Sequence, residues 1–272
     1  MTGHGELPIG RRRGGAGSPR GSNLAFVAAE AIVDTDVEIG PGAVILGSDA
    51  KTGIVTVVQK GAVIGANATI VGGSRIGYSS VIAPGAVVTK SVPPFAMVSG
   101  NPATVVGYQS ELPSARTVGT QPIGRPLDLG PEIGSNLDLG VGGCCLFRLR
   151  SFSDVRGYLH PLEFGSDIPF LPRRAFLVRG VDSGDVRGEH AHRACRQFLI
   201  AAHGSLSVLL DDGMNRCEVG LSDPTVGLDL MPMVWATQYK FSRDAVLLVL
   251  ASHAYDAEDY IRVYEDFRDE IA

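Results

Sequence analysis

The first half of the chain carries a large aliphatic residue at every sixth position. The series consists of Val27, Val33, Ile39, Ile45, Val58, Ile64, Ile70, Ile76, Ile82 and Val88. A helix buries residues about 3.6 positions apart and a strand buries every second residue, so neither explains this spacing. Short strands around a triangular coil explain it, because each side contributes one inward residue and stacked coils bury a column of Ile and Val. The repeat therefore predicts a solenoid.

The end of the repeat, VIAPGAVVTKSVPPFAMVSGNPATVVGY, is similar to the end of sugar N-acyltransferases. Residues 23–108 thus resemble the hexapeptide-repeat acyltransferases, which implies a short left-handed β-helix. Enzymes of that family commonly use a histidine as general base, yet the sequence has no histidine between His4 and His160. We therefore expect a non-catalytic scaffold that forms trimers, as such helices usually do. N-acyl transfer from acetyl-CoA at the β-helix remains the alternative.

Two segments rich in Gly, Pro or Ser flank the repeat. Residues 1–22 contain the basic cluster Arg11–Arg13, and residues 109–141 contain LDLG twice. Such compositions bury little apolar surface. We expect a disordered leader at 1–22 and an extended linker at 109–141.

Charge, hydropathy and cysteine content limit the binding partners and the cellular compartment that we expect. A net charge of -5 argues against a nucleic acid held by phosphate contacts. No apolar stretch is long enough for a membrane span, and the N-terminus lacks the apolar core of a secretory signal. The cysteines show no CxxC pairing and no zinc-ligand spacing, so free thiols in a reducing cytoplasm are expected. They are Cys144, Cys145, Cys195 and Cys217.

Residues 142–272 follow a different pattern, typical of antiparallel strands. Short apolar or alternating runs such as QFLIAAHGSLSVLLDDG and DAVLLVLAS are separated by Gly, Pro and Asp turns. Strands at this density without intervening helices predict a barrel or jelly roll. Only residues 257–271, AEDYIRVYEDFRDEI, have the composition of a helix. The predicted fold class is mainly β: a β-helix, then a cupin barrel with a C-terminal helix.

Two histidines stand one residue apart in the segment RGEHAHRACRQF. On a strand His190 and His192 point to the same side, so both rings enter one pocket if that side is the barrel interior. A metal-binding cupin typically follows its His-x-His with a glutamate and a further histidine. Here Arg196 occupies the glutamate position and the later strand, MPMVWATQY, has no histidine, so we expect no metal. The simplest alternative is a pair of core histidines, but free imidazoles amid this much charge suit proton transfer.

Three separated motifs carry a second resemblance: RGEHAHRACRQFLIAAHGSLSVLLDDG, VWATQYKFSRDAVLLVLAS and YDAEDYIRVYEDF. Together they make residues 143–270 look like the cupin-type sugar 3,4-ketoisomerases, which also occur fused to hexapeptide-repeat acyltransferases. The resemblance implies an isomerase that acts on dTDP-4-keto-6-deoxyglucose through an enediolate, in deoxyamino-sugar biosynthesis and with no cofactor. A non-catalytic sugar-nucleotide-binding scaffold is the third possibility.

The resemblance assigns roles to particular side chains. We expect His192 to be the base for C3 and C4, His190 its partner or the oxygen proton shuttle, and Arg187 the group that stabilises the enediolate or holds the pyrophosphate. The expected substrate-binding residues are Arg174, Arg196, Trp235 and Tyr239. Stacking of Trp235 and Tyr239 on the thymine and ordinary core packing are both open.

Two departures from the family and one motif complete the expectations. Ala236 stands where relatives often have histidine and Phe176 where they often have tyrosine, which predicts altered substrate choice, altered product stereochemistry or weak activity. The C-terminal motif around Asp259 is expected to pack a closing segment on the barrel. Dimers through the cupin and trimers through the β-helix together would give a hexamer. The sequence leaves the product configuration and the nucleotide open.

Overall fold

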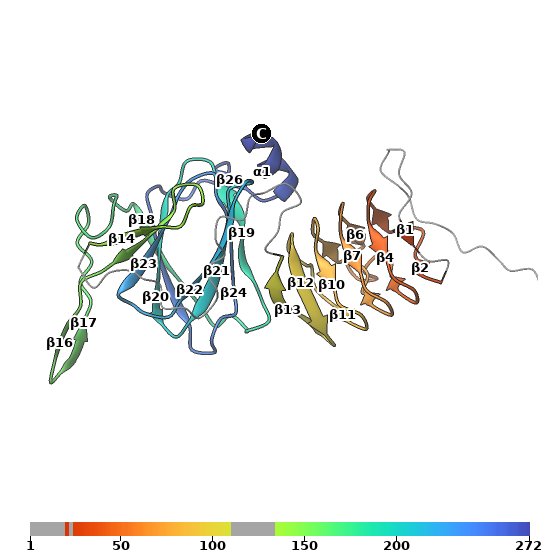
Figure 1. The fold of residues 1–272 in the computed structure, drawn as a ribbon, viewed down its shortest axis with the longest axis horizontal. Helices are drawn as coiled ribbons and strands as arrows, with labels where there is room; N and C mark the ends of the chain where they lie inside the picture. The colour runs from red at the N-terminus through yellow and green to blue at the C-terminus, as the bar shows by residue number, and fades with distance from the viewer. Residues whose placement is uncertain (1–19, 22–23, 110–133) are drawn as a thin grey trace, which may run out of the picture. The chain divides into compact units, whose positions relative to one another are not determined.

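The computed structural model describes residues 20–21, 24–109 and 134–272. The chain divides into two compact units, Met1–Gln109 and Ser110–Ala272 (Figure 1). Most of the expected leader and linker, including Arg11–Arg13, lies outside the described residues.

The first unit is the predicted β-helix. Its strands are β1 (Arg20–Gly21), β2 (Phe26–Val27), β3 (Ile32–Val33), β4 (Glu38–Ile39), β5 (Val44–Ile45), β6 (Val57–Val58), β7 (Val63–Ile64), β8 (Thr69–Ile70), β9 (Arg75–Ile76), β10 (Val81–Ile82), β11 (Val87–Val88), β12 (Ala96–Gly100) and β13 (Ala103–Tyr108). Every third strand pairs in parallel, which gives the sheets β1-β4-β7-β10, β2-β5-β8-β11 and β3-β6-β9. The antiparallel pair β12–β13 follows β10 in the first sheet. Because β1 pairs with β4, the end of the expected leader is a strand.

The interior of this unit explains the six-residue repeat. From Val33 to Val88 each repeat aliphatic is buried. A small residue often follows because the coils stack closely: a Cβ atom on Gly40 would lie 2.6 Å from the backbone nitrogen of Ala66 in the next coil. The break in the repeat corresponds to a loop between β5 and β6, closed by a bridge between Ser48 and Val55. Pairing of β3 with β6 continues the solenoid past this loop.

The second unit is the predicted antiparallel barrel, built from two sheets. One has the order β14 (Asn136–Asp138), β15 (Cys145–Arg148), β23 (Val226–Leu230), β20 (Gln197–His203), β25 (Val246–Ala251) and β18 (Arg174–Arg179). The other has the order β22 (Arg216–Leu221), β21 (Leu206–Asp211), β24 (Trp235–Tyr239), β19 (Arg187–His192) and β26 (Tyr260–Ile261). The hairpin β16 (Phe152–Asp154) and β17 (Gly157–Leu159) stands apart as a two-stranded sheet (Figure 1).

Alternating side chains fill the space between the two barrel sheets. Leu199 and Val249 from one sheet join Val208 and Val219 from the other in a single buried cluster. The opposite face of β20 carries Phe198 and Ile200, which pack in a second, smaller cluster. The period of a strand thus determines which residues of β20 face the barrel interior.

Two boundaries differ from the sequence-based expectation. The expected linker reached residue 141, but β14 pairs with β15, so this end of it belongs to the barrel. The expected helix over 257–271 begins only at Tyr264, as α1 (Tyr264–Ile271), because Tyr260–Ile261 pair with β19 as strand β26. In the described part of the chain no helix is long and apolar enough to cross a membrane.

Candidate active site

A β-bulge in β19 sets the orientation of the two histidines. Gly188 has φ 80° and Glu189 has φ 54°, and the pairing with β24 shifts between Gly188 and His190. A side chain at Gly188 would be strained at this φ, and its Cβ atom would lie 2.6 Å from the carbonyl oxygen of Ala236. The bulge directs the Gly188 carbonyl to Nδ1 of His190 at 2.8 Å. Bulges of this kind re-aim side chains next to functional sites.

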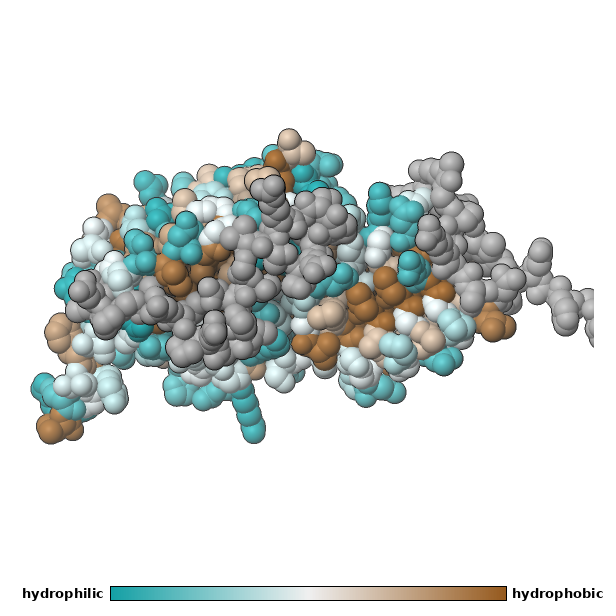
Figure 2. Space-filling model, viewed as in Figure 1, coloured by the Kyte–Doolittle hydropathy of each residue, from teal (hydrophilic) through white to brown (hydrophobic). Residues whose placement is uncertain are grey.

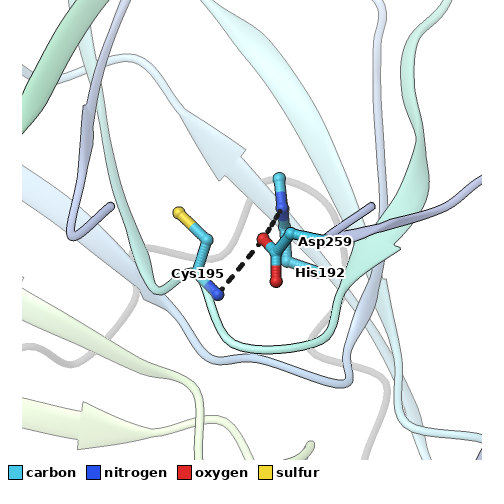
Figure 3. A group of neighbouring side chains, drawn as sticks. All are labelled: His192, Cys195 and Asp259. Carbon is cyan, nitrogen blue, oxygen red and sulfur yellow. Dashed lines mark hydrogen bonds and ion pairs between the residues drawn. The ribbon is translucent and has the colours of Figure 1, made fainter. Parts of the chain in front are cut away.

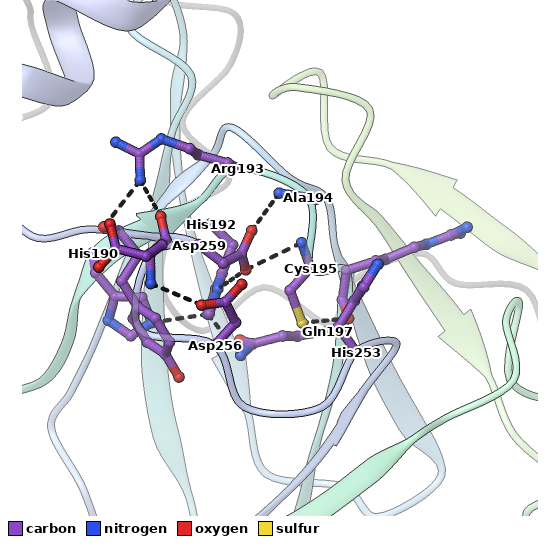
Figure 4. Close-up of polar contacts among 12 residues, drawn as sticks. His190, His192, Arg193, Ala194, Cys195, Gln197, His253, Asp256 and Asp259 are labelled. Atoms are coloured by element: carbon purple, nitrogen blue, oxygen red, sulfur yellow. Dashed lines mark hydrogen bonds and ion pairs between the residues drawn. The ribbon is translucent and has the colours of Figure 1, made fainter.

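The two imidazoles face each other beyond the bulge. Nε2 of His190 lies 3.2 Å from Nε2 of His192, and the ring planes are 81° apart (Figure 4). His192 is 4% exposed and His190 is partly buried. The expectation that both rings lie on one side of the strand is confirmed. Neither ring is an isolated core histidine.

Asp259 holds the second imidazole from behind. Asp259 directly precedes strand β26, and this strand lies beside β19 because Tyr260 pairs with His192 and Ile261 with Ala191. Nδ1 of His192 lies 2.7 Å from Oδ2 of Asp259, and the backbone N–H of Ala194 donates to Oδ1 at 2.7 Å (Figure 4). Burial opposes ionisation of Asp259, but these hydrogen bonds outweigh it and hold its pKa below the usual value. An ionised carboxylate therefore fixes the proton of His192 on Nδ1.

Burial also shifts the pKa values of the two histidines. It lowers the pKa of His190 to about 4, although the hydrogen bond that Nδ1 of His190 donates to the Gly188 carbonyl acts in the other direction. It lowers the pKa of His192 as well, although the hydrogen bond to Asp259 opposes it. Imidazoles kept from taking up solvent protons are available as bases near neutral pH.

Polar and aromatic neighbours complete the surroundings of the pair. Gln197 at the start of β20 places its Nε2 atom 3.1 Å from Nε2 of His192. The centre of the Tyr260 ring lies 4.3 Å from that of His192, and the guanidinium of Arg262 lies over the Tyr260 ring at 4.1 Å. Arg174 and Gln197 both pair with Ala251, so they point to the same face of their sheet from either side of β25.

Two guanidinium groups therefore accompany the histidines. The positive charges of Arg174 and Arg262 both lower the pKa of His192. Among the described residues neither one has a carboxylate within ion-pair distance. Arg174 instead lies over the rings of Phe176 and Tyr255, at 5.2 and 5.6 Å. Unpaired guanidinium groups beside a base are suited to an anionic substrate.

Sequence comparison assigns the barrel half to a family. The sequence model described as "FdtA: WxcM-like, C-terminal" matches residues 142–272. The "TDP-4-oxo-6-deoxy-alpha-D-glucose-3,4-oxoisomerase" of Aneurinibacillus thermoaerophilus is 39% identical over 127 residues, which cover 47% of this chain and 91% of that protein. The chain belongs to the FdtA family.

Solved structures of similar barrels include the QdtA sugar 3,4-ketoisomerase of Thermoanaerobacterium thermosaccharolyticum in complex with TDP. It is 38% identical and covers 47% of this chain and 93% of that chain, with a TM-score of 0.46. The WlaRB TDP-quinovose 3,4-ketoisomerase of Campylobacter jejuni is 38% identical and covers 47% and 99%, with the same TM-score of 0.46.

The β-helix half matches N-acetyltransferases. A "dTDP-3-amino-3,6-dideoxy-alpha-D-galactopyranose 3-N-acetyltransferase" of Aneurinibacillus thermoaerophilus is 49% identical over 53 residues, 28% of that protein. A "2,3,4,5-tetrahydropyridine-2,6-dicarboxylate N-acetyltransferase" of Staphylococcus aureus is 38% identical over 78 residues, 33% of that protein. The chain thus spans about a third or less of each of these transferases, and the expectation of hexapeptide-repeat kinship is confirmed.

The other residues expected at the site, Arg196, Trp235, Tyr239 and Arg187, have surroundings of their own. Arg196 forms a two-pronged ion pair with Asp229, with distances of 2.8 and 2.5 Å, and alternation places it on the opposite face of β20 from Gln197. Trp235 packs against Tyr264 of α1, with ring centres 5.2 Å apart. Tyr239 is buried on the same face of β24 as Trp235. Arg187 is exposed at the start of β19, opposite Gln238.

One further cluster has ligand types that bind metals. His192, Cys195 and Asp259 bring one potential ligand atom each within 4.8 Å of one another (Figure 3). Their donors and acceptors are already paired: Nδ1 of His192 with Oδ2, and the N–H groups of Ala194 and Cys195 with the carboxylate. An ion bound by the Asp259 carboxylate and Nδ1 of His192 would displace the Nδ1 proton and break these bonds. The cluster fits a hydrogen-bonded support for the imidazole better than a metal site.

Sequence reasoning missed Asp259 and Gln197 as site residues. Asp259 was expected to pack a closing segment, because the helix-like composition of 257–271 concealed the short strand β26. A buried catalytic imidazole requires an acceptor for its second nitrogen, and that requirement was the available signal for a carboxylate in this motif.

Proposed function

We propose that the barrel is a sugar 3,4-ketoisomerase that converts dTDP-4-keto-6-deoxyglucose into a dTDP-linked 3-keto-6-deoxyhexose. The observation that carries the proposal is the imidazole pair, with His192 held by Asp259 at 2.7 Å and its Nε2 atom facing His190. Support comes from the family and from the oxoisomerase that is 39% identical over nearly its whole length.

The reaction needs one well-placed base and little else. The C4 carbonyl acidifies the hydrogen on C3, so a neutral imidazole can remove it without a cofactor. In the proposed mechanism Nε2 of His192 takes this proton, an enediolate forms, and a proton returns at C4. Asp259 orients His192 and stabilises the imidazolium that forms, and His190 assists as the partner of the base.

Positive groups stabilise the anionic parts of this substrate. We assign Arg174 and Arg262 to the diphosphate or the enediolate, because both lie near the imidazoles and neither is neutralised by a carboxylate among the described residues. Arg187, exposed at the start of β19, is a further proposed contact to the diphosphate. Arg196 is bound to Asp229, and Trp235 is packed on α1, so we leave both out of the proposed site.

We propose the β-helix, residues 23–108, as an assembly domain and residues 142–272 as the catalytic domain. The described residues of the β-helix contain no histidine that could serve as the base of an acyltransferase. Figure 2 shows hydrophobic side chains gathered over this unit, and Phe26, Leu46 and Ile54 are exposed large apolar residues there. Such a surface is suited to contact with further copies of the chain.

The barrel has its own candidate contact surface. The hairpin β16–β17 exposes four large apolar side chains, Phe152, Val155, Tyr158 and Leu159. An isolated two-stranded hairpin is marginally stable in water, so packing against a second copy would stabilise it. Dimers through the barrel and trimers through the β-helix would close into a hexamer. The mass in solution tests this: a hexamer is expected, and a monomer or a simple dimer contradicts it.

Product analysis tests the activity directly. The full chain is incubated with dTDP-4-keto-6-deoxyglucose, and the sugar is followed by NMR for a carbonyl at C3. We expect conversion by the wild type and by a His203→Asn control on the surface, and loss of conversion in His192→Asn. An unchanged sugar with the wild type contradicts the ketoisomerase proposal. Acetylation of an amino sugar by this chain in the presence of acetyl-CoA contradicts the proposal that the β-helix serves only for assembly.

A further inference from the structure

Arg193 directly follows the proposed base and binds the segment that carries Asp259 at several points. Its backbone N–H donates to the carbonyl oxygen of Asp259 at 2.8 Å. Its Nη1 group donates to the carbonyl oxygen of Glu258 and, at 3.3 Å, to that of Tyr260 (Figure 4). Arg193 therefore binds the carbonyl groups of three consecutive residues, with Asp259 in the middle.

The other side of the same guanidinium is bound to the C-terminal helix. Nε and Nη2 of Arg193 donate to the two carboxylate oxygens of Glu270, at 3.0 and 2.5 Å. Glu270 lies in the last turn of α1, and the buried side chains of Tyr264 and Phe267 fix this helix on the barrel. A planar guanidinium that binds a carboxylate through two nitrogens has a defined orientation, so its third nitrogen points in a defined direction.

The segment around Asp259 needs such a support. Residues 253–258, which lead to it, are exposed, and strand β26, which follows it, has only two residues. The backbone N–H groups of Ala194 and Cys195 donate to the carboxylate, but they can do so only while the main chain of Asp259 is in place. The guanidinium holds this main chain directly.

We propose that Arg193 is a positioning residue: held by Glu270 of α1, it keeps the backbone around Asp259 in place and so maintains the hydrogen bond that His192 donates to the carboxylate. The expected effect on turnover rests on the proposed function, whereas the expected effect on the His192 ring in the free protein does not.

A role in stability alone does not account for this arrangement. The side chains of Arg193 and Glu270 are 44% and 34% exposed, and exposed ion pairs stabilise a fold only slightly. A misplacement of about 1 Å in an active site, by contrast, can lower a rate by about 100-fold. We therefore expect the loss of Arg193 to change catalysis much more than it changes the fold.

The surroundings of His192 determine the direction of the effect on its pKa. Burial and the charges of Arg174 and Arg262 lower this pKa, and Asp259 raises it. If the carboxylate moves away, the opposing influences remain, so the pKa of His192 falls further. Removal of the positive charge of Arg193 would by itself raise the pKa, so a fall identifies displacement of the carboxylate. The titratable and charged groups that face the ring are His190, Cys195, Tyr260, Asp259, Arg174 and Arg262.

Titration of the free protein tests the positioning without any substrate. With ¹⁵N-histidine labelling, the ring nitrogens of His192 are followed against pH in the wild type, in Arg193→Ala and in Arg268→Ala, a control at an exposed arginine of the same helix. We expect the midpoint of His192 to fall by about 0.5–1 pH unit in Arg193→Ala and to stay constant in the control. An unchanged or raised midpoint in Arg193→Ala overturns the proposal.

Kinetics on the full chain test the consequence for turnover. We expect Arg193→Ala to lower kcat by about 5- to 50-fold while KM changes by less than about threefold. Arg193→Lys keeps the charge but not the planar fork, so it recovers only part of kcat. Glu270→Ala, which releases the guanidinium from α1, lowers kcat less than Arg193→Ala. A wild-type kcat in Arg193→Ala overturns the proposal, and a wild-type kcat in Glu270→Ala overturns the role of the helix.

A double variant shows whether Arg193 acts through Asp259. When Asp259→Asn has already removed the charge, Arg193→Ala should lower kcat by a much smaller factor than in the wild type. Fully multiplicative losses would show that Arg193 acts by another route and would overturn the proposal. Absence of any 3-keto product with the wild type contradicts the proposed function instead, and the titration of His192 still decides the positioning.

Discussion

Replacing Asp259 with Asn tests how the carboxylate supports the base. The substitution keeps the shape of the side chain and an oxygen for the Ala194 N–H, but removes the charge that lies 2.7 Å from Nδ1 of His192. A hydrogen bond to a charged group contributes about 1.5–3 kcal/mol. If this stabilisation develops mainly as His192 becomes an imidazolium, kcat falls by about 10- to 150-fold, since each 1.36 kcal/mol corresponds to a factor of ten.

The assay separates this effect from misfolding. Because Asp259 contacts His192 at Nδ1 and not at Nε2, we expect KM to change by less than about threefold while kcat falls. Asp244→Asn is the matched control, since Asp244 pairs with the exposed His203 at 3.1 Å and should leave both constants unchanged. Thermal unfolding of both variants checks the fold. A wild-type kcat in a folded Asp259→Asn variant would refute the role of the carboxylate.

Three further outcomes follow from other contacts. Arg174→Ala raises KM for the nucleotide sugar by about 10- to 100-fold if this guanidinium binds the diphosphate, and steady-state kinetics showing an unchanged KM would exclude that contact. Tyr264→Phe removes the hydroxyl that donates to the buried Asp211 at 2.8 Å, and we expect the free energy of unfolding to fall by about 1–2 kcal/mol. An unchanged midpoint in denaturant titration would show that this hydrogen bond does not stabilise α1. Burial lowers the pKa of His190 from 6.5 to about 4, so between these pH values the folded state binds fewer protons than the unfolded state. We therefore expect the contribution of His190 to the free energy of unfolding to be fully present above pH 6.5 and to decline towards pH 4. Denaturant titrations at several pH values check this, and a free energy of unfolding that stays constant over this range contradicts it.

The architecture could be predicted from the sequence because the six-residue repeat of the β-helix and the two-residue alternation of the barrel strands are both visible in the order of the side chains. The six-residue series identified the column of buried aliphatics from Val33 to Val88, and alternation placed His190 and His192 on one side of β19. These features depend only on local geometry. The bulge at Gly188, by contrast, appears only when β24 is in place beside β19.

Features that depend on long-range pairing were harder to predict. Asp259 reaches His192 across 67 positions through a two-residue strand, whose sequence also suits a helix. Arg196 has the composition of a binding residue, yet the face of β20 on which it lies is settled by its pairing with Asp229. Trp235 similarly became a packing residue because α1 covers its side of β24.

The fate of the C3 hydrogen tests the central claim most directly. A substrate labelled with deuterium at C3 is incubated with the wild type and with His192→Asn, and the label at C3 is followed by NMR. We predict that the wild type removes the deuterium as the carbonyl moves to C3, whereas His192→Asn leaves it in place. Deuterium that stays at C3 with the wild type, or that disappears equally fast with His192→Asn, would contradict the assignment of this imidazole as the base.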